Sequence, residues 1–289
     1  MTTGAGREPH RWETARDAFG LEGRVALITG GAGMLGRQHA EVVAEAGGQP
    51  VLIDLAAARP ADAAADLEKR FGHASLGLAA DISSEDQARG AVEAALDRFG
   101  RIDILVNNAS LTVKGGAEGL KGYFAPFEEY PLELWQRGLD VGLTGAFLMC
   151  RTAGRAMAEA GAGVILNIAS TAGLVGPDHR IYEGTIDPYT GKPFNTPIAY
   201  AATKAGLIGM TRYLATYWAR RNVRVNALSP GGVFDDHAER FVAAYSQRVP
   251  LGRMADRSEY KGAVLFLISD ASSYMTGANL VVDGGLTCW

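Results

Sequence analysis

The chain has 289 residues, of which 47% are apolar and 21% charged, and this suits one large, well-packed α/β domain. Its net charge of −4 provides no basic surface for nucleic acid or acidic membranes, and no apolar run is long enough to cross a bilayer. Two cysteines make no disulfide framework and favour a reducing, cytoplasmic location.

Residues 1–20 form a polar arm without the apolar segment of a signal peptide, and we expect this arm to be disordered or loosely docked. Along residues 21–289, apolar stretches alternate with helical patterns. We predict strands at 25–29, 50–53, 76–80, 102–106, 164–168, 223–228 and 279–282. We predict helices at 36–46, 61–71, 84–99, 132–160, 200–220 and 257–268. This alternation predicts a single α/β domain with a Rossmann-type, doubly wound parallel sheet of about seven strands.

Two polar stretches interrupt the alternation, at 111–130 and 176–197, and each follows the carboxyl end of a predicted strand. Open α/β sheets bind ligands at that edge, and insertions of this length are typical of lids or binding loops. Their polar and aromatic side chains include Lys114, Lys121, Tyr123, Phe124, Phe127, Asp178, His179, Arg180, Tyr182, Glu183, Tyr189, Lys192 and Asn195.

The five histidines show no metal-ligand spacing, so we predict no metal site. The acidic cluster at 235–239 is interpreted as the capped, solvated start of a helix rather than as a set of metal ligands.

A glycine-rich turn, residues 29–36, connects the first predicted strand to the first predicted helix and contains the spacing G-x-G-x-x-G. Glycines let the backbone approach a pyrophosphate, and the helix N-terminus favours its charge. The alternative is a structural turn that binds nothing. Asp54, at the end of the second strand, can bind both ribose hydroxyls and would repel a 2′-phosphate. No basic residue lies inside the turn, although Arg37 follows it, so we predict NAD rather than NADP.

Tyr200 and Lys204 lie four residues apart in a predicted helix, so both are on the same face, one turn apart. Lowering the pKa of a phenol from near 10 to about 7 takes roughly 4 kcal/mol. An ammonium about 4 Å from the phenol, at an effective dielectric of ~20, supplies energy of that order. We therefore predict that Lys204 lowers the pKa of Tyr200, which acts as a general acid/base. Ser170, at the end of a predicted strand, can hold the substrate oxygen. A Tyr–Lys pair at this spacing also arises by chance, so the assignment depends on the other motifs.

With these motifs together, residues 21–285 resemble the classical form of the short-chain dehydrogenase/reductase family. The remaining motifs of the resemblance are Asp81-Ile82, Asn107-Asn108-Ala109, Asn226, Pro230-Gly231, Thr276-Gly277 and Asp283-Gly284-Gly285. The resemblance implies that Ser170, Tyr200 and Lys204 are catalytic and that Lys204 also holds the nicotinamide ribose. It implies cofactor contacts from Gly30, Gly33, Met34, Leu35, Gly36, Asp54, Asp81, Ile82, Asn108, Ala109, Tyr200, Lys204, Pro230, Gly231 and Val233. Family members associate through their long helices, so we expect a homo-oligomer, either a dimer or a tetramer.

Three positions depart from the family pattern. Met34 stands where the classical form has its middle glycine, a spacing more like the family's extended branch. Gly142 stands where classical members carry a catalytic asparagine, whose main-chain carbonyl helps to hold a water that links the lysine to solvent. Glycine keeps that carbonyl, so we expect Gly142→Asn to leave turnover unchanged or to raise it. Asp235 stands where a threonine often holds the carboxamide.

The segment between Ser170 and Tyr200 is longer than in classical members, and its polar and aromatic side chains suit a polyhydroxylated or charged substrate. In this segment the chain looks similar to reductases of bacterial amino-sugar and nonulosonic-acid pathways. We predict an NAD-dependent oxidoreductase that interconverts a secondary alcohol and a ketone on a polar, sugar-like small molecule. The alternatives are a reductase of 3-oxoacyl thioesters or of other ketones, and a non-catalytic dinucleotide-binding protein. The insertion could also pack against a neighbouring subunit without touching substrate.

Overall fold

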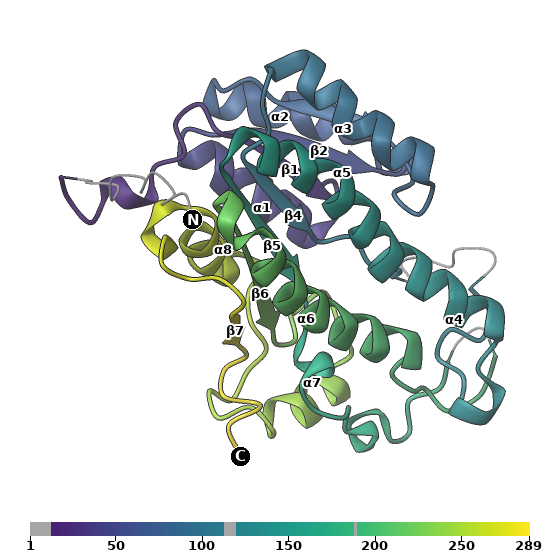
Figure 1. Ribbon diagram of the computed structural model, residues 1–289. Coiled ribbons are helices and arrows are strands. Elements are labelled where there is room, and N and C mark those ends of the chain that lie inside the picture. The colour runs from purple at the N-terminus through teal and green to yellow at the C-terminus, as the bar shows by residue number, and fades with distance from the viewer. Residues whose placement is uncertain (1–12, 113–119, 188–189) are drawn as a thin grey trace.

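The computed structural model describes residues 13–112, 120–187 and 190–289 (Figure 1). Most of the predicted arm, the centre of the first insertion with Lys114, and Tyr189 of the second insertion lie outside the described residues. The described end of the arm forms a short 3-10 helix, Asp17–Phe19, and Leu21 just after it is fully buried.

Seven parallel strands in the described residues form one sheet in the order β3-β2-β1-β4-β5-β6-β7. They are β1 (Val25–Thr29), β2 (Gln49–Asp54), β3 (Leu76–Ala79), β4 (Ile104–Asn107), β5 (Gly163–Ile168), β6 (Val223–Pro230) and β7 (Asn279–Val282). The winding reverses after β3, so β1 and β4 are neighbours, with Leu27 paired to Leu105. Ligands bind outside the carboxyl ends of the strands at such a reversal. The predicted doubly wound parallel sheet is confirmed.

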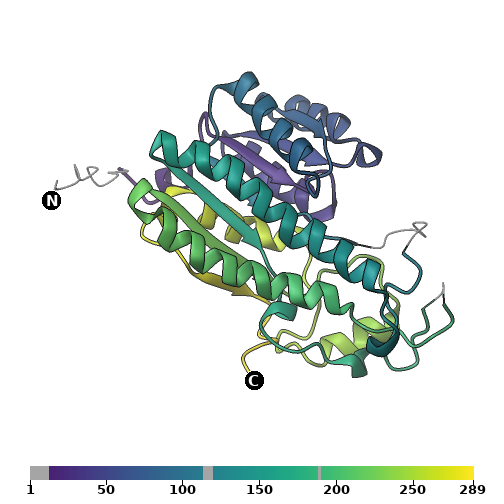
Figure 2. The same ribbon diagram turned by 45° about the vertical axis from the view of Figure 1, so that its right-hand side comes forward.

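Helices cover both faces of this sheet (Figures 1 and 2). Their bounds are α1 (Met34–Glu45), α2 (Pro60–Phe71), α3 (Glu85–Phe99), α5 (Gly145–Ala160), α6 (Ile198–Trp218) and α8 (Lys261–Ile268). Because successive strand side chains point to opposite faces, Ala26 and Ile28 pack with α1, α2 and α8, whereas Val25 and Leu27 pack with α3, α5 and α6. Burying a Leu or Ile side chain contributes about 1.5–3 kcal/mol, so the sheet is a firm base for the loops at its carboxyl edge.

The long helix predicted at 132–160 is interrupted. α4 (Leu132–Leu139) runs into a π-helical turn, Asp140–Thr144, before α5 begins. The interruption lies where this segment presses against α6. An added Cβ on Gly138 would lie 2.7 Å from Ala199 Cβ, and one on Gly142 would lie 2.5 Å from Thr203 Cγ2. The helical pattern of the segment gave no sign of this turn, and such π turns occur often at functional sites.

A further helix, α7 (Glu239–Ser246), begins at the end of the cluster at 235–239. Its N-cap is Ala238, without a side-chain hydrogen bond, so the predicted capping is wrong. The helix predicted at 257–268 begins as the 3-10 turn Arg257–Tyr260 and continues as α8. The other predicted helices and strands agree with the structure to within two residues at each end. None of the helices in the described residues is long and apolar enough to cross a membrane.

Candidate active site

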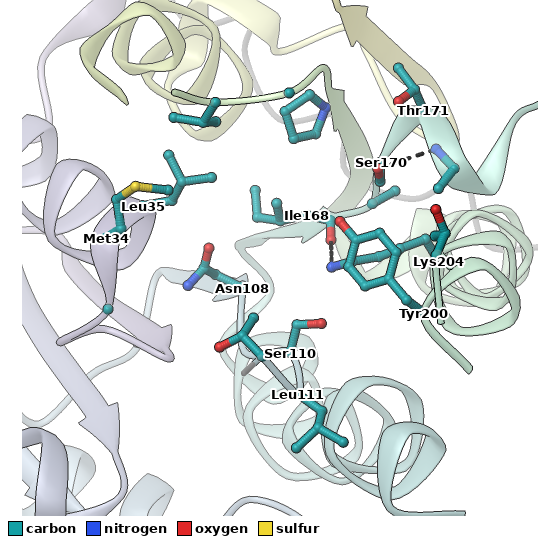
Figure 3. A pocket seen from close by; sticks show the side chains of 18 of the residues that line it. Met34, Leu35, Asn108, Ser110, Leu111, Ile168, Ser170, Thr171, Tyr200 and Lys204 are labelled. Atoms are coloured by element: carbon teal, nitrogen blue, oxygen red, sulfur yellow. Dashed lines mark hydrogen bonds between the residues drawn. The ribbon is translucent and has the colours of Figure 1, made fainter. Parts of the chain in front are cut away.

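A cleft of about 1800 Å³ opens along the carboxyl edge of the sheet, at the ends of β1, β2, β4, β5 and β6 (Figure 3). The catalytic and cofactor-binding residues that the family resemblance implies all line it. These residues are Gly30, Gly33, Met34, Leu35, Gly36, Asp54, Asp81, Ile82, Asn108, Ala109, Ser170, Tyr200, Lys204, Pro230, Gly231 and Val233. The fold thus brings motifs from across the whole chain into one site.

The glycine turn has the shape of a phosphate cradle. Gly30 has φ +62°, which L side chains rarely adopt, and an added Cβ on Gly36 would lie 2.0 Å from Gly30 O. α1 starts immediately after its N-cap Gly33, and Met34 lines the cleft at this helix start. Because glycines have no side chains, the cleft next to the turn stays open, and the first backbone N–H groups of α1 favour binding of an anion there. The turn therefore fits the pyrophosphate of a dinucleotide.

Asp54 joins the end of β2 to the glycine turn. Its Oδ2 accepts a hydrogen bond from Ala32 N (3.0 Å), and its Oδ1 accepts one from Leu55 N (2.8 Å). Next to Asp54 the cleft is lined by the uncharged side chains of Ala32, Leu55 and Ala58. Arg37 is turned back onto the turn, with Nε donating to Ala32 O (2.8 Å). The carboxylate is thus fixed in the cleft beside neutral neighbours.

Thr29 and Asn108 hold the two sides of the crevice together. Thr29 Oγ1 accepts hydrogen bonds from Asn108 N (3.0 Å) and Ala109 N (3.1 Å). Asn108 Nδ2 donates to Thr29 O (3.0 Å) and Gly30 O (3.2 Å). These bonds set the position of the glycine turn relative to β4, which is the spacing that a bound dinucleotide would need.

Ser170, Tyr200 and Lys204 lie together in the cleft, the first just after β5 and the others near the start of α6 (Figure 3). Ser170 Oγ accepts from Ala172 N (3.2 Å), which orients the hydroxyl. Lys204 is 3% exposed, and its Nζ donates to Ile168 O (2.7 Å). The same Nζ lies 5.4 Å from the centroid of the Tyr200 ring.

The pKa of Tyr200 is raised from its ordinary value, contrary to the prediction that Lys204 lowers it. Burial of the phenol is the largest cause, while a hydrogen bond with Ser170 opposes the rise and the phenol of Tyr182 adds to it. Burial also lowers the pKa of Lys204 to about 8, so its amine is mostly protonated at neutral pH. That ammonium is bonded to Ile168 O and not to the phenol. In this chain by itself, Tyr200 therefore keeps its proton at neutral pH and can serve as a proton donor.

Gly142 is buried in the π-helical turn, against Thr203. Thr203 is itself 2% exposed, and its Oγ1 donates to Gly138 O (3.4 Å). An asparagine at 142 would have to push Thr203 aside or separate the turn from α6. The expectation that Gly142→Asn leaves turnover unchanged or raises it does not take this contact into account, and the contact argues for a loss.

Stacked rings hold the second insertion at the cleft. Phe194 stacks on Phe124 of the first insertion, with 3.9 Å between centroids, and packs on Tyr182 at 4.9 Å. Tyr182 in turn stacks on Phe241 of α7 at 5.4 Å. Asn195 N adds a hydrogen bond to Phe124 O (3.0 Å). Because Asp178, Arg180 and Tyr182 line the cleft, this insertion forms part of its wall.

Several residues of the cleft were not predicted from the sequence. They include Arg137, Phe241, Tyr245, Arg248 and Trp289. Tyr245 Oη accepts from Gly232 N (2.5 Å) and so fixes the segment that follows β6. The spacing of Phe241 and Tyr245, four residues apart on α7, was the signal that could have identified them as one face of a helix.

Two residues of the family motifs, Asn226 and Asp283, have structural roles. Asn226 Nδ2 donates to Met275 O (2.8 Å), and its Oδ1 accepts from Ala278 N (3.1 Å), which ties β6 to the turn before β7. Asp283 accepts from Gly285 N and Thr287 N (2.9 Å each) and so shapes the C-terminal turn. In the described residues, no group of three or more His, Cys, Asp or Glu side chains could hold a metal ion.

Two family models match consecutive parts of the chain. Residues 24–182 match the model described as short chain dehydrogenase, and residues 190–287 match one described as enoyl-(acyl carrier protein) reductase. The two matches cover both the glycine turn and the segment with Tyr200 and Lys204.

Known proteins resemble the chain over nearly its whole length. D-threitol dehydrogenase of Mycolicibacterium smegmatis is 36% identical over 274 residues, which cover 93% of this chain and 95% of the relative. A gluconate 5-dehydrogenase from Burkholderia cenocepacia, solved with NADP and tartrate, has a TM-score of 0.80 and 32% identity over 96% of this chain and 100% of its own. An NAD+-bound xylitol dehydrogenase has a TM-score of 0.78 and 30% identity over 92% and 99% of the two chains. These similarities give no support to the predicted amino-sugar or nonulosonic-acid subgroup.

Proposed function

We propose a cofactor and a substrate class for this chain, which belongs to the short-chain dehydrogenase/reductase family and is therefore an oxidoreductase of alcohol and ketone groups. The proposed cofactor is NAD, and the proposed substrate is a polyhydroxylated, sugar-like molecule. The observation that carries this proposal is the placement of Ser170, Tyr200 and Lys204 in the same cleft as the glycine turn. A proton donor and a dinucleotide cradle are the two parts that hydride transfer to a carbonyl carbon requires.

Tyr200 is the proposed proton carrier. Its phenol, which burial keeps protonated, gives its proton to the substrate oxygen during ketone reduction and is then reprotonated from solvent. In alcohol oxidation the phenol first loses its proton to solvent, and the phenolate then takes up the proton of the alcohol. Ser170, oriented by Ala172 N, donates a hydrogen bond to the same oxygen and stabilises its developing negative charge. The bound nicotinamide cofactor supplies or accepts the hydride.

Lys204 has a different part in this scheme. Its ammonium is anchored on Ile168 O and still has donors for cofactor hydroxyls, since an ammonium carries three. Gly30, Gly36 and the first turn of α1 would hold the pyrophosphate, with Met34 against it. The Asn108 and Ala109 backbone would face the cofactor from β4, and Asp81 and Ile82 would lie beside the adenine.

The proposed preference for NAD rests on Asp54. Its carboxylate is fixed beside neutral side chains, so it can accept hydrogen bonds from both ribose hydroxyls and would repel a 2′-phosphate. Similar proteins have been solved with either cofactor, one with NADP and one with NAD+, so the fold alone does not decide the preference.

The proposed substrate class rests on the polar wall of the cleft and on relatives named for polyols. Tyr182, Thr196 and Asp235 offer hydroxyl and carboxylate groups that suit a substrate with several hydroxyls. A 3-oxoacyl thioester or steroid ketone has fewer hydroxyl groups to match this polar wall. A non-catalytic role is disfavoured because a dinucleotide sensor has no use for the Ser170–Tyr200 pair.

For assembly we propose a homo-oligomer. Tyr213 and Tyr217 on α6 stack on each other yet are 66% and 65% exposed, so apolar surface remains on this helix for a second subunit.

A substrate panel tests the proposal. The protein is incubated with NAD or NADP and with alditols, aldonates, 3-hydroxyacyl thioesters and hydroxysteroids, and reduced cofactor is followed by its fluorescence. We expect turnover with NAD on the polyhydroxylated compounds. Faster turnover on thioesters or steroids, or with NADP, would contradict the corresponding part of the proposal.

A further inference from the structure

Two arginines in the wall of the cleft share one carboxylate. Asp178 of the second insertion accepts hydrogen bonds from Nε and Nη2 of Arg180 (2.8 Å each) and pairs with Nη1 of Arg248. Arg180 belongs to the 3-10 helix His179–Tyr182, whereas Arg248 follows the end of α7. All three side chains line the cleft, so the cluster is part of the site and not of the outer surface alone.

The cluster carries one positive charge in excess. Two guanidinium groups face one carboxylate, and that carboxylate has no spare capacity. Its Oδ1 accepts from both N (3.0 Å) and Nε of Arg180, and its Oδ2 accepts from both arginines. Each guanidinium has five N–H donors, and Asp178 takes up only two from Arg180 and one from Arg248. Donors therefore remain on both arginines for a second anionic group.

Both arginines line the same cleft as Tyr200, and each is close in the chain to a tyrosine that interacts with Tyr200. Tyr182 follows Arg180 by two residues, and its phenol is close enough to raise the pKa of Tyr200. Tyr245 precedes Arg248 by three residues; burial is the largest cause of its raised pKa, and the phenols of Tyr182 and Tyr200 add to the rise. Each arginine thus sits about one turn of chain from a phenol that is close to Tyr200.

We propose that Arg180 and Arg248 form a carboxylate-binding subsite and that the preferred substrate is a polyhydroxylated acid. The carboxylate lies between the two guanidinium groups while a secondary alcohol or ketone carbon faces Tyr200. A planar carboxylate matches the guanidinium fork through parallel N–H···O bonds, which a hydroxyl cannot form. This inference rests on the proposed oxidoreductase function and narrows its substrate class.

A matched pair of substrates tests it: an aldonate and the alditol of the same length and configuration, which differ only in the carboxylate. We expect the wild-type kcat/KM to favour the aldonate by about tenfold to a hundredfold, the range of a hydrogen bond to a charged group. In the variant Arg180→Gln/Arg248→Gln this ratio should fall toward one, mainly through a higher KM for the aldonate. Arg180→Lys/Arg248→Lys keeps both charges and should retain part of the preference.

Arg155→Gln is the matched control, since Arg155 is exposed on α5 and pairs there with Glu159. It should leave the ratio unchanged. NADH titration of every variant verifies that the fold and the cofactor site are intact.

The subsite is wrong if the wild-type protein uses the alditol as well as the aldonate, or if the double Gln variant binds NADH but keeps the wild-type ratio. A phosphorylated alditol that is preferred to the aldonate would contradict the carboxylate assignment. Turnover of neither substrate class by a protein that binds NADH would instead overturn the proposed function itself.

Discussion

Lys204 lies beside the ring of Tyr200: its ammonium is 5.4 Å from the ring centroid and donates a hydrogen bond to Ile168 O at 2.7 Å. The two residues therefore have separate tasks. Tyr200 keeps its proton because burial raises its pKa, and Lys204 keeps a buried positive charge in the wall of the cleft. Burying an ammonium is costly, so a lysine in this position is expected to serve function more than stability.

This separation predicts how cofactor affinity responds to pH. Burial lowers the pKa of Lys204 to about 8, so raising the pH through that value removes the ammonium and the charged hydrogen bonds it can offer. We expect the Kd for NADH to rise by about tenfold as the amine is deprotonated. Fluorescence titration at a series of pH values measures this, with Lys204→Arg as the control that stays charged. A wild-type Kd that is constant through pH 8 would show that the charge does not contribute.

Gly142→Asn should destabilise the protein and reduce turnover, because a Cβ at this position would lie 2.5 Å from Thr203 Cγ2. Overpacking of this kind costs about 1–3 kcal/mol of unfolding free energy. Thr203→Ser removes that methyl group and keeps the hydroxyl, so the double variant should recover much of the loss. Denaturant unfolding and turnover of the four proteins in this cycle measure the coupling. A single Gly142→Asn variant with full stability and wild-type or higher turnover would restore the view that the position tolerates the family's asparagine.

His39 should make stability depend on pH on the acidic side. Its side chain, on α1, is 1% exposed, and within the described part of the chain its two ring nitrogens have no hydrogen bond of normal geometry. Burial is the main influence on its pKa, and the nearby side chain of Asn108 opposes that influence. Burial lowers its pKa from 6.5 to about 4. The unfolded chain therefore binds this proton more readily, and the stability contributed by neutral His39 is present above pH 6.5 and lost as the pH falls toward 4.

The expected loss is roughly 3 kcal/mol, at about 1.36 kcal/mol per pKa unit. Urea unfolding of the wild type and of His39→Leu between these pH values separates this loss from other acid effects, because the variant lacks the titrating group. Parallel pH profiles for the two proteins would mean that His39 is not the source.

Asp54→Asn should shift the cofactor preference toward NADP. The amide keeps an oxygen acceptor for Leu55 N but removes the charge that would repel a 2′-phosphate. We expect the ratio of kcat/KM for NADP to that for NAD to rise by roughly tenfold, the effect of relieving a like-charge contact of about 1.4 kcal/mol. Asp62→Asn, an exposed carboxylate on α2, is the control and should leave the ratio unchanged. The same result for both variants would remove Asp54 from the explanation.

The cofactor half of the site could be predicted from the sequence because its geometry is local. Gly30 and Gly36 are required by the turn that they form, and Asp54 ends the strand beside it. Asn108 and Ser170 likewise lie one and two residues after the ends of β4 and β5, so predicting these strands was enough to place them. Parallel strands bring their carboxyl ends to one edge, so identifying the strands was enough to bring these residues together.

The rest depends on contacts between distant segments, which no local pattern encodes. The direction of the Tyr200 pKa shift follows mainly from burial, with a smaller contribution from the phenol of Tyr182. The intolerance expected at Gly142 follows from a single methyl group on α6. The pairing of Arg248 with Asp178 joins α7 to an insertion whose path could not be derived from sequence.

The most direct test of the central claim is the rate of hydride transfer in Tyr200→Phe, measured in a single turnover with NADH and ketone substrate, together with the variant's Kd for NADH. If the Tyr200 phenol delivers the proton, transfer slows by about a hundredfold or more while the Kd stays near the wild-type value. An unchanged transfer rate, or a slower rate explained entirely by weaker NADH binding, would contradict the assignment of Tyr200 as the proton carrier.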